Sequence, residues 1–266
     1  MWHHFASGLD DYPRGLQSDE RDENVDLLGW MSTAARVMAD YARLSGDAPG
    51  AARYEADAAR WVAVLERHWD ERAGAFCEVA VAAFGSASPS PEPEPGAPAP
   101  SPPYHLPNAQ MGLVCHIGYV AIMPLLFRML PADSPRLGRL MDIMADPAHL
   151  ASPYGLRALS ASDPEYGVVL DFSEDYWRSS VWVNMNYLAV AALRYYADVP
   201  GPHALRAREL GAQLSENVTR LVVDEYHRTG FIWEHYRSTD GVGRGTHPFT
   251  GWSALIALLV ADQHPL

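Results

Sequence analysis

The chain has few basic residues for its size. Its 20 Lys and Arg stand against 33 Asp and Glu, which gives a formal net charge of −13. A surface with this excess of negative charge repels nucleic-acid phosphates, so the composition argues against a nucleic-acid partner. It argues in the same way against binding to anionic membrane surfaces, but it places no restriction on a neutral ligand.

Cysteine is also scarce, with Cys77 and Cys115 as the two thiols of the chain. Two cysteines allow one disulfide but no disulfide framework, and metal-binding spacings of the CxxC type are absent. Because free cysteines are commonly buried as small apolar residues, we expect two buried free thiols, with a single bridge as the alternative. Neither a metal site nor a cofactor is expected.

Long apolar runs are missing as well. Residues 117–130 come closest, but the run is short and contains Pro124 and Arg128, so no segment is expected to span a bilayer. The first residues lack a basic region followed by an apolar run, so the sequence predicts no signal peptide. The chain by itself is expected to be soluble.

Aromatic residues, by contrast, are plentiful, with 8 Trp and 13 Tyr. Their rings combine a flat apolar face with a polar edge, which suits sugar rings as ligands. A core rich in tryptophan explains the same composition equally well.

Apolar residues recur with helical spacing over most of the chain, and alternating strand patterns are rare. This predicts an all-α fold in a single domain, residues 1–266, with an irregular stretch at 151–178. Residues 86–103 are rich in proline, which removes backbone N–H donors, and they are expected to form a disordered surface insert. The expected helices are residues 24–45, 50–69, 112–131, 134–145, 180–198, 202–223 and 250–262.

A weak internal repeat supports a regular helical architecture. In two places an amphipathic helix is followed by an acidic pair, a glycine turn and an apolar–x–Glu segment, which ends at Glu78 and at Glu234. Recurring units of this kind favour helices that alternate between an inner and an outer ring, as in an α/α toroid.

Two acidic segments are candidates for chemistry. Asp10 and Asp11 lie in a glycine- and proline-bounded turn beside Tyr12, and Glu234 lies among aromatic residues after Gly230. Burial beside aromatic rings shifts carboxyl pKa values, and glycoside hydrolysis needs two carboxyl groups in different protonation states. A capping turn for the first segment and an exposed edge glutamate for the second are the structural alternatives.

Four segments together resemble glycoside hydrolase family 63, which contains processing α-glucosidases. They are SGLDDYPR at 7–14, YGLRALS at 154–160, YWRSSVWVNMNYL at 176–188, and GFIWEHY with GRGTHPFTGWSAL at 230–255. The resemblance implies an (α/α)6 barrel (toroid) and an inverting mechanism, with Asp10 as general acid and Glu234 as general base. The sequence itself does not separate Asp10 from Asp11.

The resemblance also implies a glucose site and a substrate, the terminal α-1,2-linked glucose of a glucosylated high-mannose N-glycan precursor. Another α-glycosidase of the same clan, acting on trehalose or a mannosyl or glucosyl small molecule, is an alternative, as is an inactive carbohydrate-binding remnant. The two-carboxylate mechanism requires no metal or cofactor. The residues implied to line the site are Tyr12, Arg14, Trp177, Arg178, Trp182, Asn186, Tyr236 and His247.

The position of Asp10 near the start implies a departure from the family. Twelve helices with their loops need roughly 300 residues, so we expect about eight helices in a barrel incomplete at its N-terminal side, with exposed aromatic surface. Family members of eukaryotes work in the endoplasmic reticulum behind an N-terminal membrane anchor, which implies that location here although no anchor is seen. The oligomeric state stays open.

Overall fold

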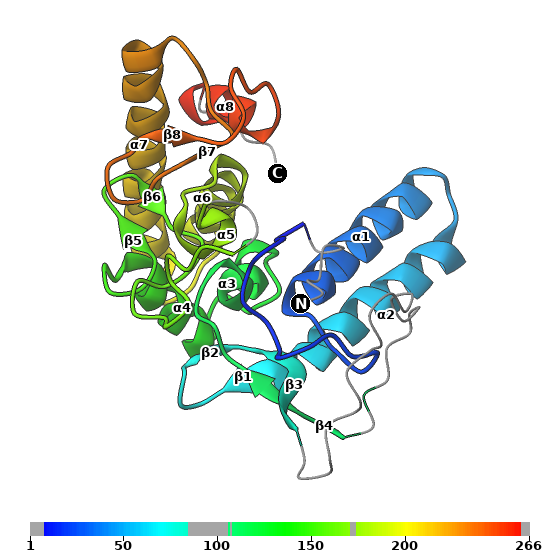
Figure 1. Cartoon of the computed structure of the whole chain (residues 1–266). Coiled ribbons are helices and arrows are strands. Elements are labelled where there is room, and N and C mark those ends of the chain that lie inside the picture. Colours follow the sequence, from blue (N-terminus) through cyan, green and yellow to red (C-terminus); the bar gives the residue numbers. More distant parts are fainter. Residues whose placement is uncertain (1–7, 85–105, 107, 171–173, 262–266) are drawn as a thin grey trace.

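Helices dominate the structure, a computed structural model that describes residues 8–84, 106, 108–170 and 174–261 (Figure 1). The helical prediction is confirmed for most segments, and observed and expected bounds differ by a few residues. The α-helices are α1 Val25–Leu44, α2 Ala48–Leu65, α3 Tyr119–Leu126, α4 Pro135–Ala145, α5 Tyr176–Ser179, α6 Val183–Asp198, α7 Ala204–Thr229 and α8 Ile256–Val260, with the 3-10 helices η2 Glu66–His68 and η3 Trp252–Leu255.

The long helices form two packed pairs, α1 with α2 and α6 with α7, and the shorter α3 and α4 lie between them. Helix α3 lies between α1 and α6, while η3 and α8 pack against α6 and α7. Figure 1 shows the pairs following one another along a curved row from α2 to α8.

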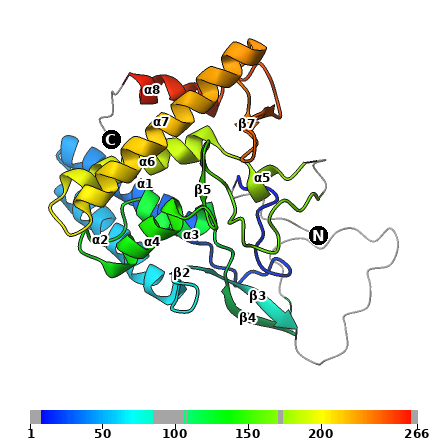
Figure 2. The ribbon, with the colours of Figure 1, turned by 90° about the vertical axis from the view of Figure 1, so that its left-hand side faces the viewer.

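The centre of the row is α6, which is apolar on nearly all sides, as a helix between two layers must be. Its residues Ala189, Val190, Ala192 and Leu193 are fully buried, and α7 covers its outer side (Figure 2). Burying an aliphatic side chain stabilises the fold by about 1.5–3 kcal/mol. The core therefore lies close to the segment that precedes α6, where the candidate site residues begin.

Helix α1 has two apolar faces. One is buried against α2 and α3 and includes Leu28 and Ala39. The other is open to solvent, with Trp30 49% and Tyr41 65% exposed, so the expected exposed aromatic surface is observed. The exposed apolar residues of α1 are Leu27, Trp30, Met31, Val37, Met38, Tyr41 and Leu44.

Within the described residues, strands occur as four antiparallel pairs. The pairs are β1 Trp69–Asp70 with β2 Ala75–Phe76, β3 Glu78–Phe84 with β4 Ala109–Val114, β5 Ala151–Ser152 with β6 Gly155–Leu156, and β7 His235–Tyr236 with β8 Gly243–Arg244. The predicted helix at 112–131 is therefore wrong in its first part, because β4 pairs with β3 and helix starts after Gly118. The proline-rich insert 86–103 lies outside the described residues, on the connection between β3 and β4.

The expectation of two free thiols is wrong, because Cys77 and Cys115 form a disulfide. Glu78 pairs with Val114 across the β3–β4 hairpin, which sets the two neighbouring cysteines opposite each other with their Cα atoms 4.6 Å apart. That separation suits a bridge. The sequence could not show it, because the partner strand lies beyond the proline-rich insert.

Candidate active site

The first acidic segment is a tight turn fastened to α5. The backbone N–H of Tyr12 donates to the carbonyl oxygen of Leu9 at 3.1 Å. The carboxylate of Asp11 is fully buried and accepts the N–H of Trp177 at 2.7 Å. Burial raises the pKa of Asp11, although the Trp177 N–H and the charge of Arg178 oppose that rise. Asp11 therefore anchors the turn.

Asp10, the neighbour of Asp11, is only half-buried. Its charge acts on the hydroxyl of Tyr176 and raises the pKa of that group. A carboxyl group that acts on a leaving group has to remain reachable by substrate. The structure thus separates two acids that the sequence could not, with Asp11 turned into the core and Asp10 partly open.

The second acidic segment follows α7, which ends at Gly230 with a left-handed φ of 79°. The backbone of Glu234 is held on both sides, since its N–H donates to the Thr246 oxygen at 3.0 Å and its oxygen accepts the Trp252 indole N–H at 2.9 Å. Its carboxylate accepts the Tyr176 hydroxyl on Oε1 and the Thr246 N–H on Oε2, the latter at 3.0 Å. Both carboxylate oxygens of Glu234 are therefore oriented by neutral donors.

These donors set the charge of Glu234. Burial raises the pKa of the carboxyl, but the hydrogen bonds from Tyr176 and Thr246 outweigh burial and leave the pKa below its usual range. An ionised carboxylate at neutral pH can accept a proton from water. The charge of Asp10 acts on the same Tyr176 hydroxyl. Asp10 and Glu234, which are far apart in the sequence, therefore both interact with one tyrosine.

A stack of aromatic rings stands behind that tyrosine. Trp177 and Trp182 are parallel, with ring centroids 3.7 Å apart, and His235 stacks on the other face of Trp182 at 4.6 Å. The rings of Trp177, Trp182 and His235 are buried, and burial lowers the pKa of His235 to about 4, so it is neutral at pH 7. The two tryptophans form the wall that holds Tyr176 in place.

Three of the expected sugar-site residues have their polar groups bonded to backbone inside the protein. The hydroxyl of Tyr12 donates to the His116 oxygen at 2.9 Å, and that of Tyr236 accepts the Trp233 N–H at 3.2 Å. Asn186 is fully buried, and its amide bonds β6 to α6 through atoms of Leu156. These contacts explain how the loops around the carboxylates keep their shape.

The two arginines of the expected site also contact carboxylates. Arg14 has 3% of its side chain exposed and contacts Asp26 at 2.6 Å and Glu78. Arg178 donates through Nε to the Asp11 backbone oxygen at 2.7 Å and through Nη1 to Glu165. Arg178 thus ties the acid turn to α5 and to Glu165 in the loop before it.

His247 is the expected site residue that is most open to solvent. Its ring lies on Trp233, with centroids 3.8 Å apart, beside Glu234. An exposed imidazole on an indole face offers a sugar both a ring surface and a hydrogen-bonding edge.

Sequence reasoning missed two residues of this site as candidates, Tyr176 and Glu174. Tyr176 stands at the head of the recognised YWRSSVW motif, so its position carried a signal. Glu174 carried none, yet its carboxylate lies 3.4 Å from Nε2 of His235 and 3.7 Å from Nε of Arg244. Burial, with the negative charges of Asp175 and Glu234 adding to it, raises the pKa of Glu174 despite the opposing charge of Arg244.

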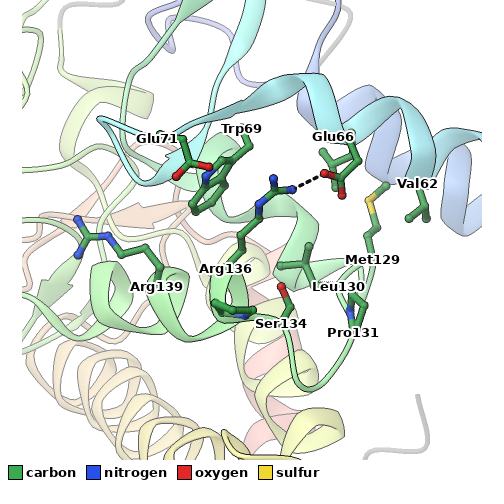
Figure 3. A pocket seen from close by; sticks show the side chains of 12 residues that line it. Val62, Glu66, Trp69, Glu71, Met129, Leu130, Pro131, Ser134, Arg136 and Arg139 are labelled. Carbon is green, nitrogen blue, oxygen red and sulfur yellow. Dashed lines mark hydrogen bonds and ion pairs between the residues drawn. The ribbon is translucent and has the colours of Figure 1, made fainter.

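A pocket of about 620 Å³ lies away from these carboxylates, between the end of α2, β1 and the start of α4 (Figure 3). Arg136 crosses it, paired with Glu66 at 2.7 Å and over the ring of Trp69 at 5.0 Å.

In the described part of the chain, no three His, Cys, Asp or Glu side chains are grouped so as to hold a metal ion. No helix in that same part is long and apolar enough to cross a membrane.

Comparison with known proteins gives the family of the chain. Residues 2–262 match the model of the glycosyl hydrolase family 63 C-terminal domain. The chain belongs to this family. It is 34% identical, over 98% of its length and 29% of the relative's, to a probable mannosyl-oligosaccharide glucosidase of Schizosaccharomyces pombe. It is 34% identical to α-glucosidase 2 of Arabidopsis thaliana, over 98% of this chain and 34% of that one.

The chain thus spans about a third of the length of these curated relatives. Among solved structures it resembles the family 63 mannosylglycerate hydrolase of Thermus thermophilus in complex with glucose. The TM-score is 0.62 with 20% identity, over 90% of this chain and 48% of that one. At this level of identity, the likeness shows that the two chains share a fold.

Proposed function

We propose that this chain carries the catalytic site of an inverting exo-α-glucosidase that removes the terminal α-1,2-linked glucose from a glucosylated high-mannose N-glycan precursor. The observation that carries the proposal is the Tyr176 hydroxyl, which donates to Glu234 and is affected by the charge of Asp10, inside a domain of family 63. The names of the relatives, a mannosyl-oligosaccharide glucosidase and an α-glucosidase, support the same reaction.

In this mechanism Asp10, in its protonated form, gives its proton to the glycosidic oxygen as the bond to glucose breaks. Glu234 takes a proton from a water molecule that attacks the anomeric carbon from the opposite face. Inverting enzymes hold these carboxyl groups roughly 6.5–9.5 Å apart to admit that water. The lowered pKa of Glu234 fits the base, since the group is ionised before the reaction starts.

The curved row of helix pairs is proposed to be part of an (α/α)6 toroid, with the site at the ends of its inner helices. His247 is proposed to contact the sugar directly. The other expected residues, Tyr12, Arg14, Trp177, Arg178, Trp182, Asn186 and Tyr236, are proposed to shape the walls of the glucose site. The endoplasmic reticulum is the proposed location, in keeping with N-glycan processing.

A second candidate comes from the structural neighbour, which is a mannosylglycerate hydrolase. A small glycoside of this kind would need the same acid and base, with different contacts for the group that leaves. Hydrolysis of a small glycoside in preference to a glucosylated oligosaccharide would favour it.

The test is hydrolysis of a glucosylated mannose oligosaccharide by the purified chain, with the anomer of the released sugar followed by NMR. We expect β-glucose as the first product, and a loss of about 10²–10⁴-fold in Asp10→Asn and in Glu234→Gln, the range for an acid or base catalyst. Glu216→Gln, an exposed glutamate of α7 paired with Arg220, is the matched control. Absence of hydrolysis by the folded chain would contradict the proposal and point to a remnant without activity.

A further inference from the structure

The hydroxyl of Tyr176 interacts with both candidate catalytic groups. It donates to Oε1 of Glu234 and feels the charge of Asp10. Its own pKa is raised, by burial first and then by Glu234, Asp10 and Glu174, so the hydroxyl keeps its proton at every working pH. A neutral donor that never ionises can orient a carboxylate without competing for its proton.

The ring of Tyr176 has little freedom to move. It meets the edges of Trp182 at 4.7 Å and of His235 at 5.0 Å, both nearly perpendicular. Trp177 lies against a third side at 6.2 Å. The backbone is fixed as well, because the Tyr176 carbonyl accepts the Trp182 indole N–H at 3.2 Å. The hydroxyl is therefore aimed by packing, which is what a preorganised site requires.

Several titratable groups lie around Glu234 and its partner Tyr176, so the ionisation of Glu234 does not depend on Tyr176 alone. The charge of Asp10 acts on the Tyr176 hydroxyl, after burial and Glu234. Burial acts first on Glu174, followed by the charges of Arg244, Asp175, Glu234 and Asp11. His235, the next residue, is neutral at pH 7 because burial lowers its pKa. Four of these groups are acids, which disfavour a further negative charge, so direct donors to Glu234 offset them.

We propose that Tyr176 is the positioning residue of the base, fixing the orientation of the Glu234 carboxylate through the hydrogen bond to Oε1 and favouring its ionised form. This assignment rests on the proposed function for its catalytic consequence. Thr246 also bonds the Glu234 carboxylate, through its backbone N–H to Oε2 and through its side chain. Tyr176 is the donor to Oε1, and its substitution leaves the backbone bond of Thr246 in place.

The test is Tyr176→Phe, which keeps the packed ring and removes only the donor. Glu234 is titrated by ¹³C NMR in protein labelled at the glutamate carboxyl carbon, with its signal assigned as the one absent from Glu234→Gln. We expect its pKa to rise by about one unit, a tenfold change in the dissociation constant. Tyr226→Phe, at a half-exposed tyrosine of α7, is the control and is expected to leave that titration unchanged.

In the hydrolysis assay, the acid limb of the kcat profile is expected to move up by the same amount, with kcat reduced about tenfold and KM little changed. A purely structural tyrosine would lower thermal stability without moving either titration. An unchanged Glu234 titration in Tyr176→Phe would overturn the inference. Because the NMR readout needs no substrate, it tests Tyr176 even in a chain that hydrolyses nothing.

Discussion

Glu78 and Glu234 differ in what surrounds their carboxylates. Glu78 is 4% exposed and is held by the guanidinium of Arg14 and the amide of Asn24. Glu234 is half-buried and is held by a hydroxyl and a backbone N–H, both neutral. Burial raises the pKa of Glu78 to about 7, whereas donors keep the pKa of Glu234 low.

The difference in surroundings indicates a structural role for Glu78 and a catalytic role for Glu234. A buried carboxylate matched to a cation is costly to leave without that cation, and it has no face left for substrate. A partly open carboxylate with neutral donors keeps its charge and can still reach a water molecule. Changes around Glu78 should therefore alter stability, and changes around Glu234 should alter activity.

The largest effect on stability is expected for Arg14→Met, which leaves Asp26 and Glu78 buried without their cation. Breaking a buried ion pair costs about 3–5 kcal/mol. Urea unfolding at pH 8, above the pKa of Glu78, measures the loss. Arg220→Met, which removes an exposed ion pair with Glu216, is the control and should cost under about 1 kcal/mol. Equal losses in the two variants would mean that the network around Glu78 does not stabilise the fold.

A smaller effect is expected from the disulfide beside Glu78. Replacing Cys77 and Cys115 together by alanine should cost about 2–4 kcal/mol, the usual range for a native bridge. Thermal unfolding with and without a reductant measures it, because the wild-type chain responds to reduction and the double variant does not. The Glu234 titration should stay unchanged in that variant, and a shift there would show that the two regions are coupled.

The smallest effect per pH unit is expected in the pH dependence of stability. The folded-state pKa of Glu78 is above its ordinary value of 4.5, so its contribution is complete below pH 4.5 and is lost as pH rises to about 7. Glu78→Gln should remove that decline, at most about 1.4 kcal/mol per pH unit. Urea unfolding between pH 4.5 and 7.5 measures it.

The contribution of Glu234 to stability should depend on pH with the opposite sign. Its pKa is lowered in the folded chain, so it stabilises above pH 4.5, and that contribution is lost on acidification. Glu234→Gln should therefore flatten the profile below pH 4.5 and leave the range from 4.5 to 7 unchanged. A decline between pH 4.5 and 7 that persists in Glu78→Gln would assign it to another group.

The sequence predicted the helices well wherever apolar residues recur with a helical period, as in α1, α2 and α6. It failed at β4, because the strand is short and its partner β3 lies on the far side of the proline-rich insert. Asp10 and Glu234 were named through family resemblance. The roles of Asp11 and Tyr176 could not be predicted, since they depend on a hydrogen bond across the fold and on ring packing.

The β3–β4 hairpin gives the protein engineer a permissive site. Its inner end is fixed by the disulfide and by the pairing of Glu78 with Val114, and the residues between Phe84 and Ala109 join its outer end. Each doubling of a loop's length costs only about 0.6 kcal/mol in closure entropy. A purification tag or fluorescent reporter inserted there would be separated from the carboxylates by a stapled pair of strands, which leaves both chain termini unmodified.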